Sequence, residues 1–148
     1  MEYFQVTIYI ETSVHGPAIR KAVGMWLIEY IRNDGTPETR QGILKREKIT
    51  ENALVLELLK EAFSRLRKPC SVRVNTPCDH VLNVMKNHWL YQWEKNDWHN
   101  AKGKPVKNAT LWQQCKQLID RHCTSFDNEF NSYKAVMQGK IRKELEKE

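Results

Sequence analysis

Several features that would assign a function directly are missing from this sequence. No apolar run approaches the length of a membrane span, and the start, MEYFQVTIYIE, lacks the basic residues and long apolar centre of a signal peptide. The chain also has no HExxH pair, P-loop or dinucleotide-binding glycine pattern. We therefore expect a cytoplasmic protein that makes no contact with a membrane.

Cysteine is sparse, and its spacing does not suit metal binding. The four cysteines form two pairs, each separated by seven residues, without a CxxC pair or a histidine at zinc-finger spacing. Such cysteines in a cytosolic protein are usually reduced and buried. We expect free thiols at Cys70, Cys78, Cys115 and Cys123.

Acidic residues are fewer than basic residues in this chain. The chain has 24 lysines and arginines against 18 acidic residues, which gives a net charge of +6 and favours a polyanionic partner. The basic residues cluster at 40–48, 86–107 and 134–147, with glutamates interrupting the last cluster. Four of the five tryptophans lie in the segment Asn87–Trp112, among the lysines of the second cluster. At 148 residues, the chain is long enough for one core, so we expect a single domain spanning 1–148.

Hydrophobic patterning predicts a strand-rich first third. The segment FQVTIYIET alternates apolar and polar residues, which is typical of a strand. The Asp34-Gly35 pair predicts a hairpin turn between the second and third strands, and Pro77 ends the fourth. The five predicted strands cover residues 4–12, 22–31, 39–49, 70–76 and 123–130.

Apolar residues at helical spacing predict helices in the remainder of the chain. The first starts at a cap on Thr50 or Asn52 and ends near Leu66, before Pro69. Asp79 is expected to cap a helix over 78–86, and Asn108 to cap the next one. The last helix begins near Ser132, and its predicted inner face consists of Tyr133, Val136, Met137, Ile141 and Leu145.

Three segments resemble the type-1 ribonuclease H family. WLYQWEKNDWHNAKGKPVKNATLWQQ, from Trp89 to Gln114, is similar to the helix and basic protrusion with which bacterial members hold the DNA strand of an RNA–DNA hybrid. ITENALVLELL resembles the start of the family's first helix, and VRVNTPCDHV resembles its fourth strand. The resemblance implies an α/β fold of the ribonuclease H type, with three antiparallel strands, parallel additions to them, and flanking helices.

The resemblance also implies a nucleic-acid interface. It predicts that lysines of the protrusion contact backbone phosphates, and that Thr50 and Asn52 contribute at the first helix. Trp89 and Trp112 are expected to pack mainly as internal supports. The residues implied in binding are Thr50, Asn52, Lys86, Trp89, Lys95, Trp98, Lys102, Lys104 and Lys107.

The family's cleavage chemistry needs four carboxylates around two magnesium ions, and the resemblance finds only one of them here. Glu11 stands where the family has aspartate on the first strand. Val55 and Pro77 stand where the resemblance places the second and third carboxylates. The last helix carries no aspartate, and Asp79 is a weak candidate to reach the site. These departures predict a degenerate, catalytically inactive or severely impaired member that needs no cofactor.

The sequence therefore predicts a catalytically inactive protein that binds RNA–DNA hybrid or a similar duplex. Two alternatives to this prediction remain. The first is a divergent nuclease that uses Mg²⁺ or Mn²⁺ at a rearranged site. That site would consist of Glu11, Glu57, Asp79 and either Asp127 or Glu129. The second is a protein-interaction module on a ribonuclease H scaffold, in which the basic segment faces an acidic protein partner.

Overall fold

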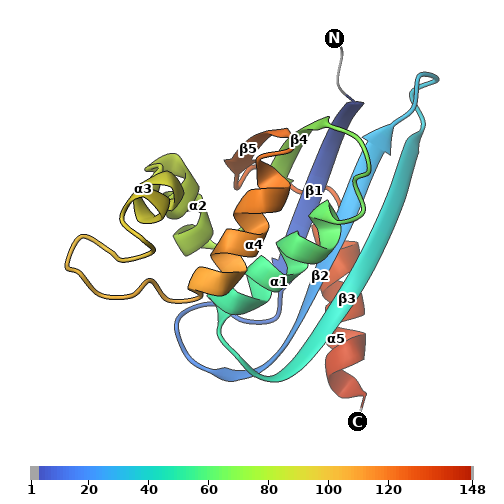
Figure 1. Cartoon of the computed structure of the whole chain (residues 1–148). Helices are drawn as coiled ribbons and strands as arrows, with labels where there is room; N and C mark the ends of the chain where they lie inside the picture. The colour runs from blue at the N-terminus through green and yellow to red at the C-terminus, as the bar shows by residue number, and fades with distance from the viewer. Residues whose placement is uncertain (1–3, 148) are drawn as a thin grey trace.

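The computed structural model describes residues 4–147 and is built around a mixed five-stranded sheet with the order β3-β2-β1-β4-β5 (Figure 1). The first three strands pair antiparallel, whereas β4 pairs parallel with β1, and β5 pairs parallel with β4. The strands are β1 (Phe4–Thr12), β2 (Arg20–Ile31), β3 (Pro37–Ile49), β4 (Cys70–Asn75) and β5 (Cys123–Asp127). The predicted fold class is therefore confirmed.

Both faces of the sheet are buried because the strands alternate between two apolar clusters. Ile8 and Ile10 of β1 enter the larger cluster, whereas Tyr9 enters the smaller one on the other face. The hairpin between β2 and β3 forms as predicted. The Asp34 carboxylate accepts hydrogen bonds from the Thr36 N–H at 2.9 Å and the Thr36 hydroxyl at 2.6 Å. Gly35 takes a φ of 87°, in the region that favours glycine.

Helices cover the two faces unequally. The helices α1 (Glu51–Phe63) and α4 (Ala109–Ile119) cover one face, and α5 (Lys134–Glu146) covers the other (Figure 1). The helices α2 (Asp79–Lys86) and α3 (Trp89–Lys95) lie beside the sheet at its β4–β5 side (Figure 1). The long segment between α3 and α4 extends away from this body.

One predicted helix cap is wrong, and another lies at the predicted position without a side-chain hydrogen bond. Cys78, not Asp79, occupies the cap position of α2, and Asp79 lies in the first turn, where a negative charge favours the helix dipole. Asn108 precedes α4 with a φ of 60° and makes no side-chain capping bond. Asparagine tolerates this left-handed conformation, so Asn108 occupies the predicted cap position of α4 but contributes no side-chain hydrogen bond. Of the two candidates at α1, Thr50 is the cap, and its hydroxyl accepts the Ala53 N–H at 3.2 Å.

The inner face of α5 is narrower than the pattern predicted. Met137 and Ile141 are fully buried, but Val136 is 55% exposed. Adjacent helical residues are rotated by about 100°, so the residue next to Met137 points away when a single stripe packs on the sheet.

The thiols are free in this structure, with Cys70, Cys78 and Cys115 buried and Cys123 exposed. Within residues 4–147, no helix is long and apolar enough to cross a membrane.

Gly42 provides a test of the packing of β3 on β2. A Cβ atom at Gly42 would lie 2.6 Å from three atoms of the Trp26 ring, and Trp26 is only 2% exposed. We expect Gly42→Ala to lower the free energy of unfolding by about 1–3 kcal/mol because an overpacked core must shift. Urea denaturation measures this change.

Gly139, inside α5, is the matched control. A Cβ atom there meets only an Arg142 guanidinium nitrogen, at 4.0 Å. We expect Gly139→Ala to raise the free energy of unfolding by about 0.5–1 kcal/mol, since alanine is the better helix former. Equal losses of stability in the two variants would contradict the packing described.

Candidate nucleic-acid interface

Tryptophans join α3 to the body of the protein. Trp112 of α4 is 1% exposed, and its ring meets that of Trp93 edge to face at 5.9 Å. Trp89 lies 6.5 Å from Trp93 but is itself 38% exposed. The expectation that Trp89 packs internally was therefore wrong, whereas Trp112 does act as a support. Leu90 is the buried residue of α3, so the neighbouring Trp89 faces outward.

The α3–α4 loop, residues 96–108, is held in shape by its own backbone. The Trp98 N–H donates to the Trp93 carbonyl at 2.7 Å, and the Trp98 carbonyl accepts from the Val106 N–H at 3.0 Å. The Asn100 side-chain oxygen accepts from the backbone N–H groups of Lys102 and Lys104 at 2.9 and 3.0 Å. Trp98 is half-buried against the core. These bonds brace a loop that would otherwise be free to move.

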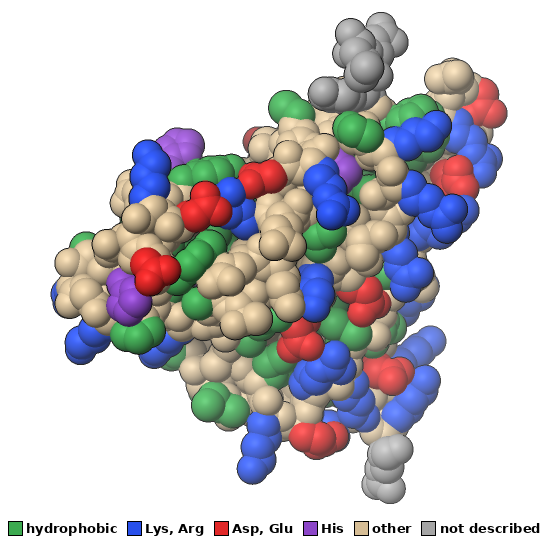
Figure 2. Space-filling view, in the orientation of Figure 1, with side chains coloured by type: hydrophobic (Ala, Val, Ile, Leu, Met, Phe, Trp, Pro, Cys, Tyr) green, Lys and Arg blue, Asp and Glu red, His purple; other side chains and the backbone are tan. Residues whose placement is uncertain are grey.

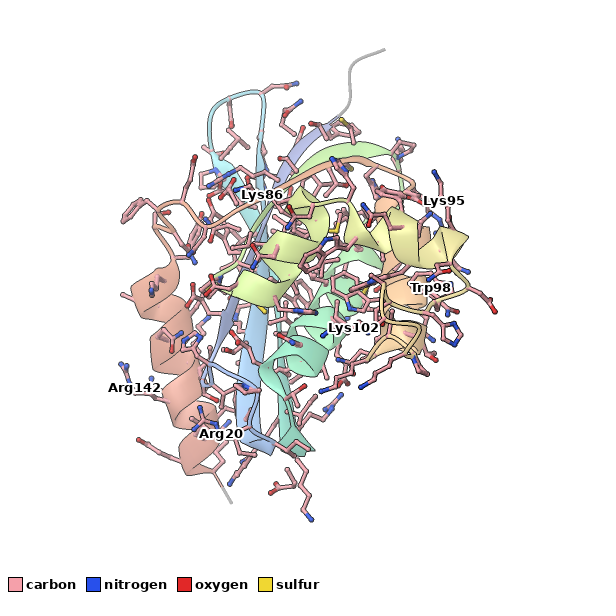
Figure 3. All side chains as sticks on the ribbon, turned by 90° about the vertical axis from the view of Figure 1, so that its left-hand side faces the viewer. Arg20, Lys86, Lys95, Trp98, Lys102 and Arg142 are labelled. Carbon is pink, nitrogen blue, oxygen red and sulfur yellow. The ribbon has the colours of Figure 1, made fainter. Side chains whose placement is uncertain are left out.

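The lysines of this region remain available to a partner. All five are exposed, and none forms an ion pair with any residue in 4–147. They are Lys86, Lys95, Lys102, Lys104 and Lys107. Figure 3 shows Lys86, Lys95 and Lys102 on the side formed by α2, α3 and the loop, with Arg20 and Arg142 toward the α5 side.

Positive charge is not confined to this loop. Figure 2 shows basic side chains around the protruding end of the molecule and also along its opposite edge.

The first turn of α1 contains an acid that the sequence analysis overlooked. Glu51 is 7% exposed, and its carboxylate lies 3.2 Å from His15 Nδ1 and accepts the Gly16 N–H at 3.1 Å. Glu51 and Asn52 both line a hollow of about 380 Å³. The Asn52 side-chain oxygen also accepts a hydrogen bond from the Cys78 thiol at 3.4 Å. The signal for Glu51 is its place between Thr50 and Asn52, the two residues that the resemblance implies in binding.

Glu11 lies at the end of β1 and is held by amides. The residue is 3% exposed, and its two carboxylate oxygens accept hydrogen bonds from Asn131 Nδ2 at 3.3 Å and Gln138 Nε2 at 2.8 Å. Sequence reasoning missed both amides. Their signal is polar residues at inward positions of a helix and of the turn before it. Glu11 lines a hollow of about 650 Å³ together with Asn75, Phe130 and residues of the β5–α5 segment.

Val55 and Pro77, where the resemblance places the second and third carboxylates, have no carboxylate to offer. Val55 is 1% exposed and belongs to the main apolar cluster. Pro77 is half-buried and lines the hollow beside Glu51, together with Asp79, which is exposed. Between these two residues, burial raises the pKa of the Cys78 thiol to about 11, so the thiol is protonated at neutral pH.

Glu57 and Asp127, two of the acids considered for a rearranged metal site, bind different arginines. Glu57 pairs with Arg46 at 3.1 Å, and Asp127 accepts two hydrogen bonds from Arg73, at 2.7 and 3.1 Å. Glu129 is exposed at its side chain. In the part of the chain from 4 to 147, no three His, Cys, Asp or Glu residues come close enough to hold a metal ion. The donors around Glu11 are amides, so these side chains do not fit the two-ion centre that the family resemblance implies.

The fold and the site together define a class of protein. It is an α/β protein of the ribonuclease H type, with a carboxylate at the end of its first strand and a basic loop before its fourth helix. The chain belongs to the RNase H family, which matches residues 4–128.

Similar proteins support the assignment. A ribonuclease H of Clostridium botulinum (strain Hall) is 29% identical over 135 residues, covering 86% of this chain and 89% of that protein. A ribonuclease H of Nitratidesulfovibrio vulgaris (strain DP4) is 32% identical over 126 residues, covering 85% of this chain and 77% of that protein.

Solved structures agree with the fold. LC9-RNase H1, a type 1 RNase H with the type 2 active-site motif, superposes with a TM-score of 0.75 at 19% identity, over 97% of this chain and 71% of that one. A foamy viral protease-reverse transcriptase in complex with RNA/DNA hybrid gives a TM-score of 0.67 at 17% identity, over 95% of this chain and 19% of that one. At these identities the likeness concerns the fold alone.

The Arg73–Asp127 pair should make stability depend on acid. Burial alone would raise the pKa of Asp127, but hydrogen bonds from Arg73 and from the Glu129 backbone outweigh it and lower the pKa. A carboxyl whose pKa is lowered by folding stabilises the fold above its unfolded pKa of about 3.9, and this contribution disappears as the pH falls through the folded value. Asp127→Asn should therefore cost about 1–2 kcal/mol at pH 7, where Asp127 is charged.

Urea denaturation at several pH values measures this effect. The difference between wild type and Asp127→Asn should shrink as the pH falls below the unfolded pKa. Asp97→Asn, at an exposed residue without an ion pair in the described chain, is the control and should leave stability nearly unchanged. A difference independent of pH would contradict the assigned role of the pair.

Proposed function

We propose that this chain, acting as one domain, binds RNA–DNA hybrid or a duplex of similar shape through the α3–α4 loop and does not cleave it. The observation that carries the proposal is a contrast of charge. The lysines of the loop are exposed and unpaired within residues 4–147, whereas the carboxylate at the family's cleavage position is covered by amides.

Binding follows from the position and support of the lysines. Lys102 and Lys104 donate their backbone N–H groups to the Asn100 side-chain oxygen, and both residues are exposed to solvent. Such groups contact phosphates whatever the base sequence, and they release counterions as they do so. A duplex of A-like form would then be selected by its shape and its 2′-hydroxyl groups. Thr50, Asn52, Trp89 and Trp98 would form the rest of the surface.

The lack of cleavage follows from the side chains around Glu11. Two magnesium ions carry four positive charges, and hard cations of this kind require several oxygen ligands that are negatively charged. Here Glu11 accepts N–H groups from Asn131 and Gln138, Val55 lies in the apolar core, and Pro77 has no ligand atom in its side chain. We infer that the chain is a degenerate member of its family, without a catalytic metal centre.

Charge reversal in the loop tests the binding surface. We expect Lys104→Glu with Lys107→Glu to lower the affinity for a labelled RNA–DNA hybrid by about tenfold or more. The plot of log affinity against log salt should become shallower by about two, because two phosphate contacts are lost. Fluorescence anisotropy over a series of salt concentrations measures both quantities.

A matched double variant separates this effect from overall charge. Lys68→Glu with Lys143→Glu changes the net charge equally, at exposed positions outside the loop. This control should retain most of the affinity and a steeper salt dependence. Equal losses in the two double variants would mean that the loop is not the binding surface. Wild-type protein that binds no duplex but holds an acidic protein would instead favour the interaction module.

A cleavage assay tests the second half of the proposal. End-labelled RNA–DNA hybrid should remain intact with Mg²⁺ and with Mn²⁺, while the same sample shows a shifted band on a native gel. Glu11→Ala, purified in parallel, identifies a contaminating nuclease. Cleavage by the wild type that disappears in Glu11→Ala would show a functioning metal site and refute the proposed inactivity.

A further inference from the structure

The hollow beside Glu11 is a feature of the surface that duplex binding through the loop leaves unexplained. Its volume is about 650 Å³, within the range of about 300–1,000 Å³ typical of small-molecule sites. It lies between the ends of β1 and β4 and the segment that links β5 to α5. Most of its polar lining is uncharged, with side-chain amides at Asn75, Asn128, Asn131 and Gln138.

Several of these groups still have room for a hydrogen-bonded ligand. Each Glu11 oxygen accepts one amide N–H and keeps a second lone pair. Gln138 Nε2 donates to Glu11 and to the Thr12 carbonyl, but Gln138 Oε1 has no hydrogen-bond partner in residues 4–147. Asn75 likewise donates to Asp127 and to the Glu129 carbonyl, and its side-chain oxygen is left without a partner in the same residues. The wall is therefore rich in acceptors and suits a ligand that offers donors.

The rim of the hollow adds an aromatic ring, a cation and the exposed carboxylate of Glu129. Phe130 is 85% exposed, which is unusual for a side chain of this size because exposure forfeits its burial energy. Lys134, in the first turn of α5, is exposed and lines the same hollow. No ion pair joins Lys134 to another residue in the described part of the chain.

We propose that this hollow binds one unpaired nucleotide of the nucleic acid held by the loop. The base stacks on Phe130, donates to the acceptors formed by Glu11, Gln138 and Asn75, and leaves its phosphate near Lys134. Guanine fits best because its adjacent N1–H and N2–H₂ groups present several donors on one edge, whereas uracil offers a single N–H. Unpaired bases are commonly recognised by stacking on an aromatic ring and by hydrogen bonds to their Watson–Crick edge. This inference rests on the proposed function.

The experiment compares duplexes that differ in a single nucleotide. Anisotropy titrations compare four labelled RNA–DNA hybrids. One is fully paired, and the other three carry a single unpaired position in the RNA strand, occupied by guanosine, by uridine or by an abasic site. We expect the guanosine bulge to bind about tenfold more tightly than the paired hybrid, the typical effect of one stacked base. The uridine bulge should gain less, and the abasic bulge, which tests duplex flexibility alone, should gain nothing.

Phe130→Ala assigns the gain to this hollow. Since Phe130 is exposed, the variant should fold normally, bind the paired hybrid like the wild type, and lose the advantage of the guanosine bulge. Val136→Ala, at a residue that is 55% exposed and does not line the hollow, should keep it.

Other outcomes would overturn the inference. A gain that survives Phe130→Ala, or an equal gain with the abasic bulge, would refute base binding in this hollow. Equal affinity for the paired and bulged hybrids would refute it while leaving the proposed function intact. Failure to bind any of these hybrids would refute both.

Discussion

The parallel pairing of β1 with β4 is the constraint on which the rest of this structure depends. Parallel neighbours cannot be joined by a short turn, so the chain returns through the β2–β3 hairpin and α1 before it enters β4. Because parallel strands end at the same edge, Glu11 near the end of β1 and Asn75 at the end of β4 face one hollow. The parallel addition of β5 then brings Asp127 beside Asn75. The parallel pairing of β1 with β4 therefore places Glu11, the first-strand carboxylate, beside the other residues that line this hollow.

Within that frame, the buried and partly buried acids are matched by donors. Asp127 is held by Arg73, Glu57 by Arg46, and Glu11 by two amides. Each carboxylate would otherwise be costly to shield from water. The loop lysines have the opposite arrangement, since they stand in water without partners in the described chain and desolvate only against a ligand. These carboxylates therefore have hydrogen-bond or ion-pair partners within the protein, whereas the loop lysines form no ion pair in the described chain.

Local signals in the sequence predicted much of this fold, and they failed where long-range packing decides. The Asp34-Gly35 turn, the Thr50 cap and the alternation in β1 are properties of neighbouring residues, and all three are as predicted. Trp89 and Val136 were misjudged because burial depends on which face of a helix meets the body, and not on hydrophobicity alone. The amides on Glu11 lie 120 and 127 residues away from it, and no local pattern joins them.

The sequence by itself determined the class of fold, the basic character of the α3–α4 loop and the scarcity of carboxylates at the expected positions. These features depend on residue type and on short spacings along the chain, so they can be predicted without the three-dimensional structure. Only the tertiary structure decided what surrounds Glu11, which tryptophan is exposed, and that the exposed Phe130 lines a hollow rich in amides. Those facts depend on how segments distant in the chain pack together, because hydrogen bonds and burial are set by contacts in space.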